Sequence, residues 1–296
     1  MIRRLGLFFL VNMAIIITIS IITSALGLNR YVSSQGIDYQ MLLGFCLVWG
    51  MAGSFISLML SKQMAKWGMR LQVIGNSSRS QDEAWLYQTV QRLSRGAKLP
   101  KMPEVAIYDS PELNAFATGP SKSNSLVAVS TGLLHGMSRD EVEAVLAHEV
   151  SHVANGDMVT MTLIQGVINA FVMFFAKIVA WGVANAMRSN DDEGPSYMLA
   201  FVVEMACYVV FGLLGSLVVN WFSRQREFRA DAGAAKLSGS SKMINALQRL
   251  KSGLNIEAGD QPKEMASLKI SGGESWMALL STHPSLDDRI SRLKNA

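Results

Sequence analysis

The chain has 296 residues, of which 50% are hydrophobic and only 17% are charged. Soluble domains carry about 25% charged residues, so this composition, with a mean hydropathy of +0.24, excludes a disordered chain and argues against an ordinary soluble enzyme. The formal net charge of +4 is typical of basic flanks on membrane segments, and we expect no nucleic-acid partner. Cys46 and Cys207 lie in apolar stretches and provide no disulfide framework.

Four apolar stretches reach the length of about 20 residues that a helix needs to cross a bilayer. They cover residues 5–28, 41–60, 158–187 and 196–223, and each contains at most one charged residue. A cleaved signal peptide is the alternative for the first stretch, because Arg3 and Arg4 form a basic start. The stretch is longer than the apolar run of a signal peptide, however, and a second stretch follows closely. We therefore expect four membrane-spanning helices.

Lysine and arginine gather at the cytoplasmic ends of membrane helices. Here they precede the first stretch and follow the second and the fourth, as Arg3, Arg4, Lys62, Lys66, Arg70, Arg224, Arg226 and Arg229. The loop after the third stretch is acidic instead. This pattern predicts that both termini lie in the cytoplasm. It divides the chain into two transmembrane pairs, residues 1–60 and 158–223, and a cytoplasmic domain assembled from residues 61–157 and 224–296.

Two charged residues lie inside the predicted membrane helices. Lys177 precedes the end of the third stretch by ten residues, and Glu204 follows the start of the fourth by eight. Antiparallel helices would bring them to a similar depth, so we expect a structural ion pair or a Lys177 side chain that extends toward the membrane surface. A proton or ion path is the alternative, since charges within a membrane often serve function.

The polar segments predict an α+β domain. Capping boxes at Ser80 with Glu83 and at Ser138 with Glu141 each open a helix. Between these helices, short runs at 104–108, 114–118 and 125–130 are typical of strands. The last segment contains apolar helical spacing at 243–250 and again at 286–293, and the polar, glycine-containing residues 256–273 between them predict a mobile loop.

The helix that opens at Ser138 carries an H-E-x-x-H motif at residues 148–152. His148 and His152 would stand one turn apart on one face, where two imidazoles can bind one Zn²⁺. Glu149, offset by about 100°, can take the proton of a water activated by the metal, and the hydroxide can attack a peptide carbonyl. Two structural histidines on a buried helix are the alternative. The motif precedes the third apolar stretch so closely that its helix can run almost continuously into the membrane.

A catalytic zinc site needs a third protein ligand and one open position. Glu227 and Asp231 follow the fourth apolar stretch and are one helical turn apart, so both can face the metal. Spacing alone does not choose between them. Carboxylates on the surface of a basic helix are the alternative to either role.

Several segments together resemble peptidase family M48, a family of membrane zinc metallopeptidases. They are NAFATG (114–119), VAVSTGLL (127–134), AHEVSHVANGDMVTMTLIQG (147–166), WFSRQREFRADAGAAKL (221–237) and THPSLDDRI (282–290). The resemblance covers essentially the whole chain, including the layout of four membrane stretches.

The resemblance implies a role for each matched residue. His148, His152 and Glu227 would bind one Zn²⁺ per chain, and Glu149 would be the general base. Asp231 would orient a ligand histidine through its far N–H.

The resemblance also implies residues that handle the substrate. An edge strand would accept an extended peptide through backbone hydrogen bonds, and it consists of Asn114, Ala115, Phe116, Ala117, Thr118 and Gly119. His283 would polarise the oxyanion, and Arg289 would pair with Asp231 or Glu227. A histidine at a helix start and a solvated helix charge are the alternatives for His283 and Arg289, and His135 is expected to be structural.

The sequence therefore predicts four transmembrane helices with a cytoplasmic α+β, zincin-like (gluzincin) metalloprotease domain. The expected function is a zinc endopeptidase of the bacterial inner membrane. It would hydrolyse misfolded or damaged membrane proteins and unfolded polypeptides on the cytoplasmic side, in quality control and stress response. The lipid bilayer is the other expected partner, and the sequence does not predict an oligomeric state.

Other functions fit the sequence less well. A metal transporter or sensor would place its ligands inside the membrane helices, and an intramembrane protease would carry the motif in the middle of a span. A scaffold with an inert site conflicts with the presence of a base and candidate ligands. A prenyl-protein endopeptidase shares the motif pair, but its larger chamber is hard to build from four spans.

Overall fold

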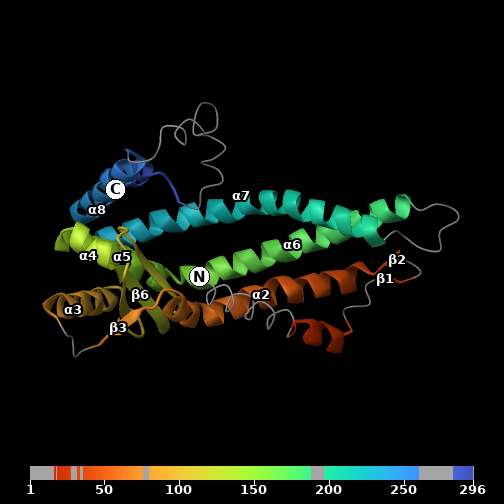
Figure 1. Ribbon diagram of the computed structural model, residues 1–296, viewed down its shortest axis with the longest axis horizontal. Coiled ribbons are helices and arrows are strands. Elements are labelled where there is room, and N and C mark those ends of the chain that lie inside the picture. The colour runs from red at the N-terminus through yellow and green to blue at the C-terminus, as the bar shows by residue number, and fades with distance from the viewer. Residues whose placement is uncertain are drawn as a thin grey trace. The chain divides into compact units, whose positions relative to one another are not determined.

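The computed structural model describes residues 17, 19–27, 32–33, 36–75, 80–187, 197–259 and 283–295. The chain forms two compact units. The helical unit comprises Met1–Ser57 and Met161–Val219, and the sheet unit comprises Leu58–Thr160 and Asn220–Ala296 (Figure 1).

Among the described residues, three helices are long and apolar enough to cross a membrane: α2 (Tyr39–Gly68), α6 (Asp157–Ala186) and α7 (Tyr197–Ser238). They account for the predicted stretches 41–60, 158–187 and 196–223. Large apolar side chains such as Phe171, Val209 and Leu213 are exposed on α6 and α7, as expected for a surface that faces lipid. Most of the stretch 5–28 lies outside the described residues, so the fourth span stays a prediction.

Small residues bring α2 and α6 close together in the helical unit. A Cβ atom on Gly50 would lie 2.6 Å from the backbone nitrogen of Ala170 and 2.7 Å from the carbonyl oxygen of Gly166. Close approach of backbones at small residues is a common way to pack helices in lipid, where dispersion contacts replace the hydrophobic effect. The described part of this unit also contains a short antiparallel pair, β1 (Val32–Ser33) with β2 (Gly36–Ile37).

The predicted ion pair inside the helical unit is confirmed. The ammonium group of Lys177 donates to Oε1 of Glu204 at 2.8 Å, and the hydroxyl of Tyr208 donates to the same oxygen at 2.7 Å. The two charges compensate each other, which lowers the cost of placing them in an apolar surrounding.

The sheet unit contains a four-stranded sheet in the order β3-β4-β6-β5. Its strands are β3 (Gln72–Ile74), β4 (Glu104–Tyr108), β5 (Ala115–Ser121) and β6 (Asn124–Ser130). β4 and β6 are parallel, and the other pairs are antiparallel. β5 is therefore an edge strand. The sequence missed β3, because only one of its three residues is buried and no alternation marks it.

The prediction of a strand over 114–118 was wrong in its bounds. β5 begins at Ala115 rather than at residue 114 and continues to Ser121, with an irregular register between Thr118 and Ser121. Asn114 precedes the strand, where its carbonyl accepts from the backbone N–H of Ser130 at 2.9 Å. At this irregularity β5 continues through Gly119 and Pro120, two residue types that are typical of a turn.

α3 (Gln81–Gly96), α4 (Thr131–Gly136) and α5 (Arg139–Asn155) contact the sheet, α8 (Ser240–Gly259) packs on α5, and α11 (Leu286–Lys294) packs on α8. The motif helix α5 is central, because it contacts α3, α8, β5 and β6. Its face toward the core includes fully buried Leu146 and Val150, beside Leu86 of α3 and Leu247 of α8. Its direction is set by the predicted capping box, in which Ser138 and Glu141 satisfy each other's backbone N–H groups.

The mobile loop predicted over 256–273 was wrong at its start, since α8 continues to Gly259. Residues 256–258 have ordinary helix propensities, and one internal glycine at 253 costs only about 1 kcal/mol. The remainder of that prediction falls on residues 260–282, which lie outside the described residues.

Two helices that carry polar motifs continue into apolar stretches. α7 has 42 residues and contains both the fourth apolar stretch and the REFRAD segment without a break. α5 and α6 are separated only by Gly156, which caps α5 in the left-handed conformation with φ of 74°. Glycine adopts this conformation without the steric penalty that a Cβ atom brings.

Candidate metal centre and active site

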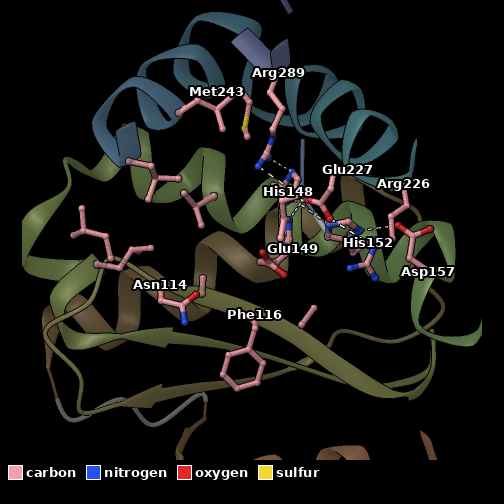
Figure 2. A pocket seen from close by; sticks show the side chains of 18 of the residues that line it. Asn114, Phe116, His148, Glu149, His152, Asp157, Arg226, Glu227, Met243 and Arg289 are labelled. Carbon is pink, nitrogen blue, oxygen red and sulfur yellow. Dashed lines mark hydrogen bonds and ion pairs between the residues drawn. The ribbon is translucent and has the colours of Figure 1, made fainter. Parts of the chain in front are cut away.

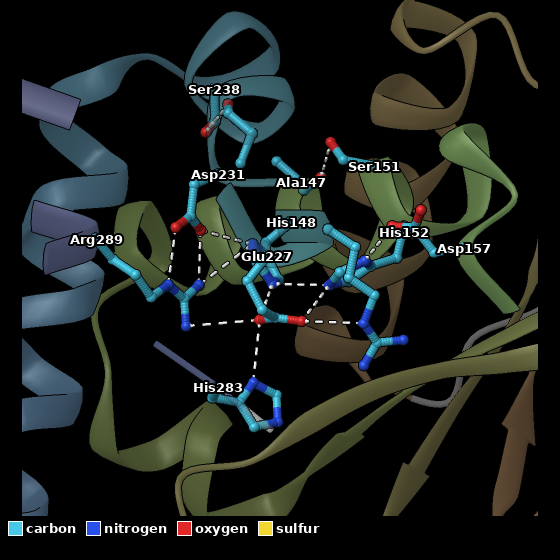
Figure 3. A network of polar contacts seen from close by, with 12 residues as sticks. Ala147, His148, Ser151, His152, Asp157, Glu227, Asp231, Ser238, His283 and Arg289 are labelled. Carbon is cyan, nitrogen blue, oxygen red and sulfur yellow. Dashed lines mark hydrogen bonds and ion pairs between the residues drawn. The ribbon is translucent and has the colours of Figure 1, made fainter. Parts of the chain in front are cut away.

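The two motif histidines converge as the helical spacing predicts. Successive turns of α5 bring Nε2 of His148 to within 3.1 Å of Nε2 of His152, with the rings edge to face. The two side chains are almost fully buried, at 7% and 9% exposure. Two Nε2 atoms therefore face one small space, while both Nδ1 atoms point outward from it (Figure 3).

Glu227 of α7 completes a three-sided cluster. Its Oε2 lies 3.4 Å from Nε2 of His148, and its Oε1 lies 3.3 Å from Nε2 of His152. The side chain is only 2% exposed. The three groups form the one cluster among the described residues that could hold a metal ion.

A close approach of α5 and α7 makes this cluster possible. A Cβ atom on Gly233 would lie 2.6 Å from Oγ and 2.9 Å from Cβ of Ser151. Ala230 and Ala234, beside Gly233 on α7, are fully buried. These small residues let α7 come near enough for the short side chain of Glu227 to reach both imidazoles.

The cluster fits a tetrahedral zinc ion. Ligand atoms at 2.0–2.1 Å from such an ion are about 3.3–3.4 Å apart, close to the separations in the cluster. Oε1 of Glu227 is also buried and makes no well-aligned hydrogen bond among the described residues. Its neighbours are Nε2 of His152 at 3.3 Å and Nε of Arg226 at 3.6 Å, and a cation would satisfy this oxygen more fully. Two imidazoles and one carboxylate are typical zinc ligands.

Each imidazole also contacts a carboxylate through Nδ1. Nδ1 of His148 lies 2.9 Å from Oδ1 of Asp231, and Nδ1 of His152 lies 2.6 Å from Oδ2 of Asp157. Arg289 of α11 donates to both oxygens of Asp231, at 2.8 and 2.6 Å. The pairing that the resemblance implied for Asp231 and Arg289 is present. Asp157 was not predicted as a site residue, although an aspartate just after the glycine that ends a motif helix is a usable signal.

These contacts shift the pKa values of the cluster. Burial alone would lower the pKa of His152, but hydrogen bonds to Asp157 and Glu227 outweigh it and raise that pKa to about 9. The pKa of His148 is raised because its hydrogen bonds to Asp231 and Glu227 outweigh burial. Burial would raise the pKa of Glu227, but its three histidine neighbours hold that pKa well below its usual range. The site therefore stabilises positive charge between its carboxylates.

A cavity of about 380 Å³ opens beside the cluster. Glu149 lines it next to His148, and Asn114 and Phe116 line it from the segment of β5 (Figure 2). Apolar side chains also line the cavity, among them Leu133, Val145, Met243, Leu247 and Leu250. A polypeptide in this cavity would meet the base, the candidate metal ligands and an apolar surface.

The part of the edge strand that lines the cavity is half-buried and has no strand partner on its outer side among the described residues. The backbone of Asn114 is hydrogen-bonded to Ser130, and Phe116 is in register with Ala128. Alternate residues of this segment, beginning with Asn114, therefore direct their backbone groups toward β6. The N–H and C=O groups of Ala115 and Ala117 therefore point toward the open edge. Ala115 and Ala117 line the cavity, whereas Thr118 and Gly119 do not.

Three predicted residues remain: His283 and Arg289, which line the cavity, and His135, which does not. Nδ1 of His283 lies 3.1 Å from Oε2 of Glu227, but the side chain is 60% exposed and stands at the rim of the cavity. Arg289 is buried and also lines the cavity. His135 lies in the last turn of α4 and does not line the cavity, consistent with its expected structural role.

Comparison with known proteins connects this geometry to a family. The model of peptidase family M48 matches residues 80–296. The chain is 53% identical over 296 residues to "Protease HtpX homolog" of Pelodictyon phaeoclathratiforme and 53% identical over 298 residues to "Protease HtpX" of Shewanella halifaxensis, with 99% of both chains covered in each case. Its fold is similar to the crystal structure of S. mikatae Ste24p, with a TM-score of 0.63 and 15% identity over 99% of this chain and 67% of that chain.

The close approach of α5 and α7 can be tested at Gly233. We expect Gly233→Ala to lower the stability of the metal-free chain by about 1–3 kcal/mol, because the new methyl group overpacks against Ser151. Zinc affinity should fall with it, since Glu227 moves away from the imidazoles. Thermal unfolding of the detergent-solubilised chain and competition with a chromophoric chelator measure the two effects.

Gly212→Ala is the matched control, because it lies on the same helix and a Cβ atom there meets nothing within 4 Å. It should leave both quantities unchanged or slightly raise the stability. Equal behaviour of the two variants would contradict the packing argument.

Proposed function

The chain belongs to peptidase family M48 and is a membrane metalloprotease; on that premise we propose that it is a zinc endopeptidase that cuts misfolded or damaged membrane proteins on the cytoplasmic side. The observation that carries the proposal is the juxtaposition of three features in the sheet unit. They are the cluster of His148, His152 and Glu227, the carboxylate of Glu149 beside it, and the open edge of β5 along the same cavity.

Glu149 is the proposed general base. It is half-buried on the face of α5 next to His148 and lines the cavity that a peptide would enter. His148, His152 and Glu227 would hold a zinc ion, which when bound would supply Lewis acidity toward a carbonyl and a water molecule. Glu149 takes the proton of that water and passes it to the departing amine, so one carboxylate serves both proton transfers.

His283 is the proposed donor to the oxyanion. Its Nδ1 contacts Glu227, and its side chain is 60% exposed and lines the cavity; Nε2 is the ring nitrogen proposed to turn toward the substrate. A hydrogen bond from that nitrogen to the developing negative charge would stabilise the transition state. Arg289 is held by Asp231 and is the proposed anchor of that carboxylate.

The edge of β5 is the proposed substrate strand. Ala115 and Ala117 can bond an extended peptide through their backbone groups and have side chains too small to obstruct it. Backbone pairing reads no side chains, which suits a protease of unfolded polypeptides with little sequence preference. The apolar surface that includes Met243 and Leu247 favours apolar side chains, and these are abundant in damaged membrane proteins.

A metal transporter or sensor is less consistent with the structure. Within the described part of the chain the candidate metal cluster belongs to the sheet unit. The two charges of the helical unit, Lys177 and Glu204, bind each other. The positive charge of Lys177 disfavours a metal cation at the Glu204 carboxylate.

The role of Glu149 is tested with the detergent-purified full chain and casein as an unfolded substrate. We expect zinc-dependent cleavage that stops on metal removal and returns on addition of zinc. Glu149→Gln should retain one equivalent of zinc and lose about 10²–10⁴-fold in rate, which is the usual contribution of a general base. Zinc binding without cleavage by the wild-type chain would overturn the proposal.

The role of the β5 edge is tested with Ala117→Pro, which removes one backbone donor. A net hydrogen bond contributes about 0.5–1.5 kcal/mol, so kcat/KM for casein should fall about two- to tenfold or more. Ala117→Ser keeps the N–H group and is the control. Cleavage by the proline variant at the wild-type rate would show that substrates do not pair at this residue.

The proposed orientation is tested by labelling in cells with a membrane-impermeant maleimide. The background is Cys46→Ser with Cys207→Ser, and single cysteines are placed at Lys101, which is exposed in the sheet unit, or at Asn190, in the predicted external loop. Position 101 should react only after lysis, and position 190 in intact spheroplasts. The reverse pattern would place the site on the opposite side of the membrane.

A further inference from the structure

The second motif histidine has its own carboxylate partner, supplied by the first residue of α6. Nδ1–H of His152 donates to Oδ2 of Asp157 at 2.6 Å, and Asp157 is only 2% exposed. Figure 3 shows this contact on the side of the imidazole away from Glu227. A short bond to a buried carboxylate is a strong, charge-assisted hydrogen bond.

This contact decides which ring nitrogen can bind a metal. A carboxylate at Nδ1 keeps the proton there, so Nε2 of the neutral ring has a free lone pair. Nε2 of His152 faces Nε2 of His148 at 3.1 Å and Oε1 of Glu227 at 3.3 Å. Loss of the contact would free the ring to rotate about its side-chain bonds and to exchange tautomers.

The two histidines are supported in different ways. Asp231, beside His148, is itself held by two hydrogen bonds from Arg289. Asp157 has no such clamp among the described residues, because Arg229 lies 3.7 Å from its other oxygen and is largely exposed. Its position comes from the backbone instead: Gly156 turns the chain with φ of 74°, and Asp157 begins the next helix.

An ordinary helix-start carboxylate does not explain this arrangement. Asp140, in the first turn of α5, is 71% exposed and pairs with Lys242. Asp157 occupies a comparable place in α6 but is buried and bonded to a candidate metal ligand. Burial of a carboxylate costs several kcal/mol unless partners compensate it, which favours a specific role.

We propose that Asp157 is a positioning residue that fixes the tautomer and ring orientation of His152 for metal binding. The proposal rests on the proposed zinc peptidase function and adds to it the start of α6 as a part of the metal centre. The second motif histidine is then held from two helices, by its own backbone in α5 and by its carboxylate partner in α6.

The test measures metal binding directly in the full chain in detergent. Asp157→Asn keeps the size and one acceptor oxygen but removes the charge, and Asp157→Ala removes the contact. We expect zinc affinity, from competition with a chromophoric chelator, to fall about 10–100-fold for Asp157→Ala and less for Asp157→Asn. The visible absorption of the Co²⁺-loaded protein should change in both variants, because the ligand geometry changes.

Asp140→Asn is the matched control for charge at a helix start and should leave zinc affinity and the Co²⁺ spectrum unchanged. At saturating zinc, the Asp157 variants should lose kcat with little change in KM, because the substrate strand is intact. Zinc affinity within twofold of wild type and an unaltered Co²⁺ spectrum in both Asp157 variants would overturn the positioning role. Failure of the wild-type chain to bind zinc would instead overturn the proposed function.

Discussion

The site depends on the burial of three carboxylates around two imidazoles. Glu227, Asp231 and Asp157 are each 2% exposed, and isolated charges at such depth would cost several kcal/mol each. Arg289, also buried, compensates one of them. Glu227 and Asp157 have only longer contacts with arginines, at 3.6 Å from Arg226 and 3.7 Å from Arg229, so a divalent cation between the imidazoles would add compensating charge to an acidic centre.

The same balance explains the behaviour expected of the metal-free protein. The raised pKa of both motif histidines means that protons take up part of the compensating charge when no metal is bound. A metal ion must displace those protons to reach Nε2, so metal binding and proton release are coupled. Asp231 contacts Nδ1 of His148, and Asp157 contacts Nδ1 of His152. These contacts do not involve Nε2, so they are kept whether Nε2 binds a proton or a metal ion.

Local patterns sufficed where one helix determines the geometry. The capping box at Ser138 and the four-residue spacing of His148 and His152 determined the start of α5 and the meeting of the imidazoles. The choice between Glu227 and Asp231 could not be made from spacing, because both lie on one face of α7. It depends on how far α7 is shifted along α5, which the contact of Gly233 with Ser151 fixes. With that shift, Glu227 meets the two Nε2 atoms and Asp231 meets one Nδ1.

Helices, rather than loops, supply the candidate metal ligands, and this affects how firmly the site is held. His148 and His152 lie within α5, and Glu227 lies within the uninterrupted α7. Side chains on regular elements are positioned more accurately than side chains on loops. Both elements also continue into apolar stretches, α7 without a break and α5 through the single residue Gly156. Because Asp157 bonds His152 directly after that glycine, movement of the first turn of α6 relative to α5 would strain a candidate metal ligand. The hydrogen bond between Asp157 and His152 therefore opposes bending at the one joint between the motif helix and its apolar continuation.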